Sequence, residues 1–256
     1  MSYIAACAII ALSALLGAVA PFLVRRRISV ETLRRHHEVG SYVFLQMGVI
    51  YAVLLAFVFT EVWSGYTAAA FAVRVEASNL VSAARLARGL PKDQADGVQN
   101  AIANYLKTTI HEGWPAMAEG EQSDAANKAF AWLWSDTRGI VVGSGDYAIL
   151  ASQIFNRLDD ANKARDERLF QMSNHVPMML WTLLSTYAFV LLAFLLFFGV
   201  ENVWSQAFFT GAFAGGIAFM IVVIAVLDFP FAGALRLSPQ PMVQALEKVV
   251  QDHENR

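Results

Sequence analysis

The chain has 256 residues, of which 57% are apolar and only 16% are charged, and its 19 basic and 21 acidic residues give a formal net charge of −2. Its mean hydropathy of +0.46 is too high for an ordinary soluble domain. A near-neutral charge without a basic stripe argues against nucleic-acid binding, which depends largely on neutralised phosphates. The single cysteine, Cys7, excludes an intrachain disulfide and a cysteine-rich metal site, and we expect no cofactor.

Four segments of the chain contain no Asp, Glu, Lys or Arg. A helix needs about 20 residues to cross a hydrocarbon core of about 30 Å, and each segment has about this length or more. The sequence therefore predicts an all-α, polytopic membrane protein with four transmembrane helices, embedded in the lipid bilayer. The segments are 2–24, 42–60, 176–200 and 202–227.

The first segment also resembles a secretory signal peptide, because the Ala-Val-Ala sequence at 18–20 has the small residues of a cleavage site. Three features favour a retained helix instead. No positive charge precedes the apolar run, Pro21 would directly follow the cleaved bond, and the arginine run 25–27 is typical of a stop-transfer flank. We therefore expect segment 2–24 to remain as the first span.

The charge of the short loops predicts the orientation, since cytoplasmic loops hold the excess of Lys and Arg. Loop 25–40 carries five arginines, whereas the connector near Glu201 has no basic residue. We therefore expect loop 25–40 to lie in the cytoplasm, with both termini and the central domain outside. The basic residues that lead into the third span favour the opposite orientation; they are Arg157, Lys163, Arg165 and Arg168.

The block between the second and third spans is predicted to be helical throughout. The run 61–90 has no proline and many alanines, which indicates that span two continues as one helix until a glycine and a proline end it near residue 90. Shorter helices are expected over 92–113 and over 123–138, where Ser123 is a good N-cap, and a long one from Asp146 leads into span three. No stretch alternates with the period of two that a half-buried strand shows.

The chain thus divides into four parts. A first transmembrane hairpin with the basic loop is followed by a helical extramembrane domain that continues spans two and three, by a second hairpin, and by a C-terminal tail. The tail contains a short amphipathic helix with Met242, Leu246, Val249 and Val250 on one face. The predicted bounds are 1–63, 64–175, 176–229 and 230–256.

Span four contains small residues with the spacing of close helix packing. Gly211 and Gly215 lie four residues apart, in the small-xxx-small pattern that lets two membrane helices approach each other. Asp228 ends the span before Pro230, where we expect it to cap the helix or to pair with Arg236. We therefore predict that the two glycines and Asp228 have structural roles.

Signatures of catalysis are mostly missing. The five histidines form no His-Glu-x-x-His pair and have no cysteine partners at zinc spacing. The Gly-Ser-Gly sequence at 143–145 lacks the outer glycines of a nucleophile elbow, and no phosphate loop or dinucleotide fingerprint occurs. We therefore predict that the protein is not an enzyme and holds no metal.

Six stretches along nearly the whole chain resemble, in order, the bacterial bestrophin-like domain family. The resemblance implies a relationship to bestrophins, which are pentameric ion channels whose second membrane helix lines a narrow apolar neck. His37-Glu38 stands where the family leads us to expect Asn-Asp, so no role of that pair is carried over. The stretches are LRRHHEVGSYVF (33–44), YAVLLAFV (51–58), EGWPAM (112–117), HVPMMLW (175–181), FFGVEN (197–202) and LDFPFAGALRLSPQPM (227–242).

Span two offers two faces from which the pore implied by this resemblance can be built. Small residues recur every four positions on one face, where another helix can pack closely. An apolar stripe on the adjacent face would form a hydrophobic constriction in an oligomer, with polar residues at its mouths and a ring of Glu61 that favours cations. The alternative is that all these residues contact lipid or pack within the protein. The packing face comprises Gly48, Ala52 and Ala56, and the stripe with its mouths comprises Gln46, Val49, Val53, Phe57, Thr60 and Glu61.

Three functions remain open. The leading hypothesis is a symmetric homo-oligomeric ion channel that conducts inorganic ions, with span two lining the pore. The alternative is a non-conducting membrane scaffold or sensor that binds a partner or ligand through its helical domain. A secondary transporter ranks third, because the two hairpins are not visible repeats and Pro21 and Pro177 lie at span ends.

Overall fold

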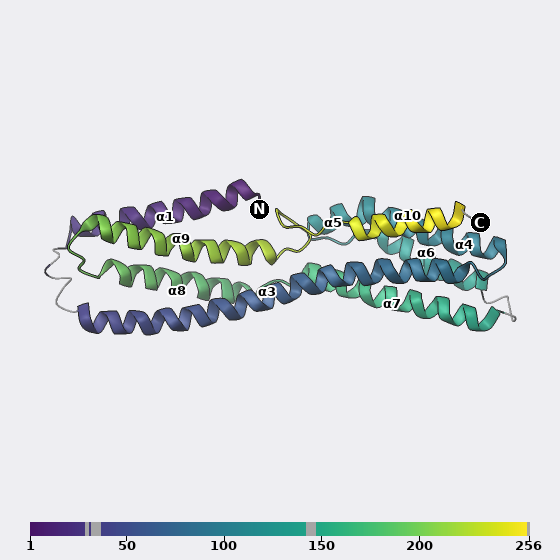
Figure 1. Cartoon of the computed structure of the whole chain (residues 1–256), viewed down its shortest axis with the longest axis horizontal. Coiled ribbons are helices and arrows are strands. Elements are labelled where there is room, and N and C mark those ends of the chain that lie inside the picture. Colours follow the sequence, from purple (N-terminus) through teal and green to yellow (C-terminus); the bar gives the residue numbers. More distant parts are fainter. Residues whose placement is uncertain (29–30, 32–36, 142–146, 255–256) are drawn as a thin grey trace. The chain divides into compact units, whose positions relative to one another are not determined.

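The structure is a computed structural model that describes residues 1–28, 31, 37–141 and 147–254. All regular elements in this part of the chain are helices, which confirms the all-α class (Figure 1). Four of them are long and apolar enough to cross a membrane, as the charge-free segments predict. These four are α1 (Tyr3–Arg25), α3 (His37–Ala87), α8 (Met178–Leu196) and α9 (Val203–Leu227).

The chain forms two compact units. The membrane unit comprises Met1–Ser64 and His175–Asp228, and the helical unit comprises Gly65–Asn174 and Phe229–Arg256. Helix α3 contributes its first part to the membrane unit and its second part to the helical unit. The remaining helices belong to the helical unit: α4 (Lys92–Thr108), the π-helix η1 (Thr109–Gly113), α5 (Trp114–Ala118), α6 (Asp124–Val141), α7 (Ala148–Ser173) and α10 (Gln240–Glu254).

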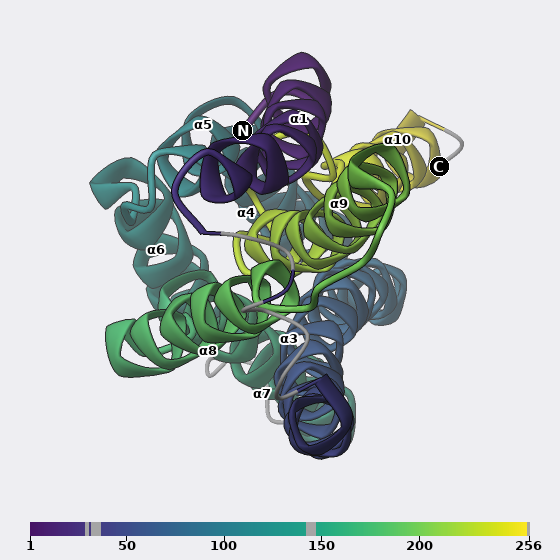
Figure 2. The same cartoon turned by 90° about the vertical axis from the view of Figure 1, so that its left-hand side faces the viewer.

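Within the membrane unit, α9 packs along α1 and also against α8 (Figure 2). Aromatic side chains of α3 pack against α8 and α9. The rings of Tyr51 in α3 and Tyr187 in α8 are stacked with centroids 5.5 Å apart. Phe44 in α3 contacts Phe198, just after α8, and Phe213 in α9, with ring centroids 5.3 and 5.7 Å away. Stacked and edge-to-face aromatic pairs of this kind add to the energy of apolar contact.

The contact between α1 and α9 is made by glycines and alanines. A Cβ atom added at Gly211 would lie 2.9 Å from the carbonyl oxygen of Ala14 and 3.0 Å from the Cβ of Ala18. A Cβ added at Gly17, on the opposite helix, would lie 2.7 Å from the Cβ of Ala214. In a bilayer such close approach provides van der Waals contact that lipid cannot replace.

We expect Gly211→Ala to lower the free energy of unfolding by about 1–3 kcal/mol, because overpacking forces the two backbones apart. Gly216→Ala is the matched control, since an added Cβ there meets no described atom within 4 Å. Denaturant unfolding of both variants in detergent measures the difference. Equal stability of the two variants would show that the α1–α9 contact tolerates separation.

The helical unit has its own apolar core, to which α3, α4, α6, α7 and α10 contribute. The C-terminal helix packs on α4, and its residues Met242, Ala245 and Val249 are buried. Val250 lies at the edge of that face and is 37% exposed. The largest fully buried apolar side chains of this core are Tyr105, Phe231, Leu80, Ile102, Leu106, Leu133, Ile154, Leu158 and Met242.

The helix predicted over 92–113 does not end as an α-helix. It changes into the π-helix η1 at Thr109, and α5 then begins with Pro115 in its first turn. Proline has no backbone N–H to donate and crowds the preceding turn, so the backbone ahead of it departs from α-helical geometry. The Ser123 N-cap is confirmed, because its hydroxyl oxygen accepts a hydrogen bond of 3.2 Å from the N–H of Ala126.

The third span follows α7 in the sequence, but the two are separate helices. Helix α7 ends at Ser173 and α8 begins at Met178, with Pro177 as its N-cap residue. A residue that precedes proline is disfavoured in the α region, so Val176 cannot continue the helix. The second span, which has no proline, continues without a break as the 51-residue helix α3.

Candidate functional site

The predicted pore stripe lies on the exposed side of α3 within the membrane unit. Val49, Val53 and Phe57 are 52%, 65% and 70% exposed. The buried side of the same helical segment consists of Tyr51, Leu55, Val58 and Val62. These buried residues recur every three or four positions, as the residues on one face of a helix do. The helix therefore packs inward on one side and presents an apolar stripe on the other.

The polar residues at the two ends of this stripe are also exposed: Gln46 at one end, and Thr60 and Glu61 at the other. The Thr60 hydroxyl donates a hydrogen bond of 2.8 Å to the carbonyl oxygen of Ala56, one turn earlier, so its proton is used within the helix. The Glu61 carboxylate remains as the charged group of this end.

The small residues of α3 are not covered by the membrane unit. Ala52 and Ala56 are exposed, and a Cβ added at Gly48 meets no described atom within 4 Å. Gly211 and Gly215, the other small residues proposed for packing, face α1 at short distance. The two sets therefore differ: the α9 set contacts a helix of the same chain, whereas the α3 set is available to lipid or to a second copy.

A partly buried set of hydrogen bonds stabilises one end of the membrane unit. Arg25, the last residue of α1, donates from Nε and Nη2 to the side-chain oxygen of Gln206 over 3.1 and 2.8 Å. Its guanidinium also donates to the carbonyl oxygens of Val200 and Glu201, in the turn between α8 and α9. The Gln206 amide nitrogen donates to the carbonyl oxygen of Phe198 over 2.9 Å. Arg25 is one of the five arginines counted in the basic loop 25–40. In the structure this residue joins α1 to α9 and to the turn that follows α8.

A second polar contact lies where α8 begins and α9 ends. The Asp228 carboxylate accepts a hydrogen bond of 2.9 Å from the N–H of Val176, and Nδ1 of His175 donates to the carbonyl oxygen of Asp228 over 2.8 Å. Pro177 follows these donors directly. Asp228 therefore holds the ends of the last two spans together.

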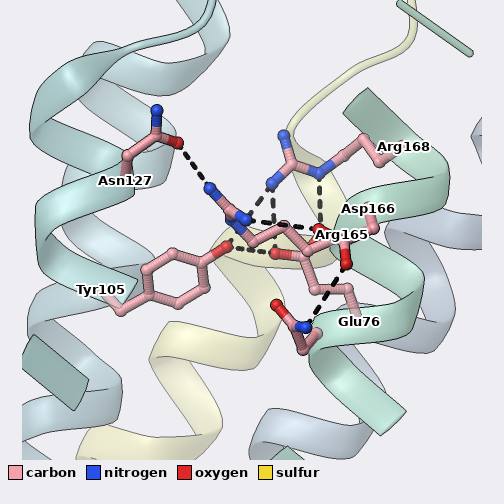
Figure 3. Close-up of polar contacts among 7 residues, drawn as sticks. Glu76, Tyr105, Asn127, Arg165, Asp166 and Arg168 are labelled. Atoms are coloured by element: carbon pink, nitrogen blue, oxygen red, sulfur yellow. Dashed lines mark hydrogen bonds and ion pairs between the residues drawn. The ribbon is translucent and has the colours of Figure 1, made fainter. Parts of the chain in front are cut away.

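The most deeply buried charges form an ion pair in the helical unit, between Glu76 of α3 and Arg168 of α7 (Figure 3). The exposed fraction is 0% for Glu76 and 3% for Arg168. The guanidinium donates from Nε to Oε2 over 2.7 Å and from Nη2 to Oε1 over 3.1 Å. This is the two-bond geometry in which Arg binds a carboxylate most strongly.

Other side chains complete the surroundings of this pair. The hydroxyl of Tyr105 in α4 donates to Oε1 of Glu76 (Figure 3). The guanidinium of Arg168 lies 5.5 Å from the ring centroid of Trp114, and its Nη1 is 3.0 Å from Sδ of Met117. Burial, and then the charge of Glu76, raise the pKa of the Tyr105 phenol. The hydroxyl therefore stays protonated and continues to donate. Together with Tyr105 the pair joins α3, α4 and α7 inside the core.

No group of three or more His, Cys, Asp or Glu side chains that could hold a metal ion occurs among the described residues. The Gly-Ser-Gly sequence considered as a nucleophile elbow lies at 143–145 and, like residues 29–30 and 32–36 of the basic loop, is outside the described residues.

The four apolar helices and the helical unit define a multi-pass, α-helical membrane protein. A model of the bestrophin-like domain matches residues 11–242, and the chain therefore belongs to the bestrophin-like domain family. This finding confirms the resemblance seen in the sequence.

Solved structures share the same fold. One variant of a bacterial bestrophin homolog from Klebsiella pneumoniae is 13% identical, with a TM-score of 0.75 over 96% of this chain and 99% of that chain. A second variant of the same homolog is 15% identical, with a TM-score of 0.76 over 96% of this chain and 97% of that chain. Comparison with curated proteins found no match.

Proposed function

We propose that this protein is a homo-oligomeric ion channel in which the exposed face of α3 lines the pore. The observation that carries the proposal is the stripe of Val49, Val53 and Phe57, which is exposed in a single chain while the opposite side of the helix is buried. Membership of the bestrophin-like domain family supports it, as does the fold shared with a bacterial bestrophin homolog.

A pore explains this face better than lipid contact alone, because its ends are polar. Gln46 lies before the apolar stripe, and Thr60 and Glu61 lie after it. In an oligomer these residues would form polar rings on either side of a hydrophobic constriction, the arrangement that gates by excluding water. Gly48, Ala52 and Ala56 would let the α3 helices of neighbouring copies approach closely.

The test is reconstitution of the purified chain into liposomes, with ion flux measured under a voltage and a salt gradient. The oligomeric state and its symmetry axis are determined on the same preparation. Flux through a symmetric oligomer with α3 at the axis supports the channel. An oligomer that never conducts at any voltage or salt concentration contradicts it and favours the non-conducting scaffold or sensor.

Glu61 is expected to set the preference for cations, since a ring of carboxylates at a pore mouth attracts cations and repels anions. Glu61→Gln should shift the reversal potential in a potassium chloride gradient toward zero, and Glu61→Lys should reverse its sign. Glu119→Gln, an exposed carboxylate of the helical unit, is the matched control and should leave the reversal potential unchanged. A reversal potential unaffected by both changes at Glu61 would place this residue outside the ion path.

A further inference from the structure

The helical unit contains a groove lined by basic side chains that the proposed pore does not use. It lies between α3 and α10 and has a volume of about 340 Å³. Three of its lining residues are cationic. Arg74 and Arg85 belong to α3 on one wall of the groove, and Lys248 belongs to α10 on the opposite wall. Hydrogen-bonding side chains lie between them, namely Ser78, Ser82 and Gln244.

The positive charge of this groove is not balanced locally. Within the described part of the chain, neither Arg74 nor Lys248 has an ion-pair partner. Arg85 contacts Asp252 over 3.2 Å, but it shares this carboxylate with Arg88, whose Nη1 is 3.4 Å away. The remaining acidic side chain of this part of α3, Glu76, is turned into the core and bound by Arg168. A groove with unpaired cations on both walls has a favourable potential for an anion.

The spacing of the cations indicates the size of that anion. Arg74, Ser78 and Ser82 follow each other at four-residue intervals on one face of α3, and Arg85 lies on the next turn. At a rise of about 1.5 Å per residue, the two arginines are about 16 Å apart along the helix. A single small anion such as chloride cannot contact both Arg74 and Arg85. A ligand with several anionic groups can contact one of these arginines and, at the same time, Lys248 on the opposite wall.

We infer that this groove binds a ligand that carries two or more phosphate groups. Phosphate oxygens match the donor fork of Arg and accept several charge-assisted hydrogen bonds at once. The hydroxyl of Ser78 and the amide of Gln244 supply neutral donors beside the cations. The ligand joins the C-terminal helix to α3, the helix that also carries the exposed stripe. The site exists whether or not the protein conducts ions.

The binding test uses the full-length chain in detergent and sodium pyrophosphate as the probe, titrated by calorimetry at constant ionic strength. Wild-type protein should bind pyrophosphate, and the double variant Arg74→Gln, Lys248→Gln should bind at least about tenfold more weakly, since bonds between charged groups are lost. Lys107→Gln removes an exposed charge of α4 outside the groove and should bind like the wild type. Both altered side chains of the double variant are exposed, so its helix content, measured by circular dichroism, should be unchanged.

Absence of pyrophosphate binding to the wild type overturns the inference, and so does equal binding by the double variant. A loss of the same size in Lys107→Gln also overturns it, because it would reveal a general effect of charge. Native mass spectrometry then identifies the source of the phosphate groups. A phospholipid with two or more phosphate groups that is retained by the wild type, displaced by pyrophosphate and lost from the double variant identifies a lipid headgroup. Pyrophosphate binding without such a lipid identifies a soluble ligand.

Discussion

Phe57→Ala is expected to raise ion leak through the reconstituted protein at least about tenfold. The ring of Phe57 is the largest of the exposed stripe and is 70% exposed in a single chain. Burial of such a side chain contributes about 1.5–3 kcal/mol, and each 1.4 kcal/mol corresponds to about a factor of ten. Removal of the ring would widen the constriction and allow water to enter it. Flux of a fluorescently reported ion from liposomes measures the change.

A matched control separates the pore from the lipid-facing surface. Phe219 in α9 is also exposed, at 53%, but lies on another helix of the membrane unit. Phe219→Ala should therefore leave the leak at the level of the wild type. Unchanged leak in Phe57→Ala, or an equal rise in both variants, would mean that the α3 stripe contacts lipid and does not line a pore.

Glu76→Ala is expected to lower the free energy of unfolding by about 3–5 kcal/mol, the cost of leaving one member of a buried ion pair without its partner. The change removes both bonds from Arg168 and the acceptor of the Tyr105 hydroxyl. Arg168 would keep its charge inside the core, where that charge has no access to water. Denaturant unfolding followed by tryptophan fluorescence measures the loss, because Trp114 lies against Arg168.

Replacement of the whole cluster tests the origin of this loss. Replacement of a buried ion pair with apolar residues of similar size is often neutral or stabilising. The triple variant Glu76→Leu, Arg168→Met, Tyr105→Phe should therefore be more stable than Glu76→Ala. Lys163→Ala, which breaks an exposed contact with Asp159, should have no measurable effect. A triple variant less stable than Glu76→Ala would show that the polar cluster itself stabilises the fold.

The positions of the helices could be predicted largely from the sequence, because the signals are local. Charge-free runs of about 20 residues predict the spans, and Gly89 and Pro91 predict where α3 stops. The π-helix at Thr109 was not predicted, because Pro115 indicates that the helix is disturbed but not how the backbone responds. The orientation of the spans in the membrane stays a prediction.

The polar contacts were harder to predict because their partners are far apart in the sequence. Glu76 and Arg168 are separated by 92 positions. One signal did exist: Glu76 occupies a place in the buried apolar repeat of α3, together with Ala69, Val73 and Leu80. A charged residue at such a position requires a buried partner. The identity of that partner depends on how the helices pack.

The chain order of the helical unit has a consequence for biosynthesis. The unit is built from residues 65–174 and from the tail, with the last two spans between them in the sequence. Its core includes Met242, Ala245 and Val249 of α10. Domains fold as units while the ribosome makes the chain, but this unit lacks part of its core until α10 emerges. Until then the apolar sides of α3 and α4 need protection, so a ribosome that stalls after the fourth span leaves a nascent chain prone to aggregation and proteolysis.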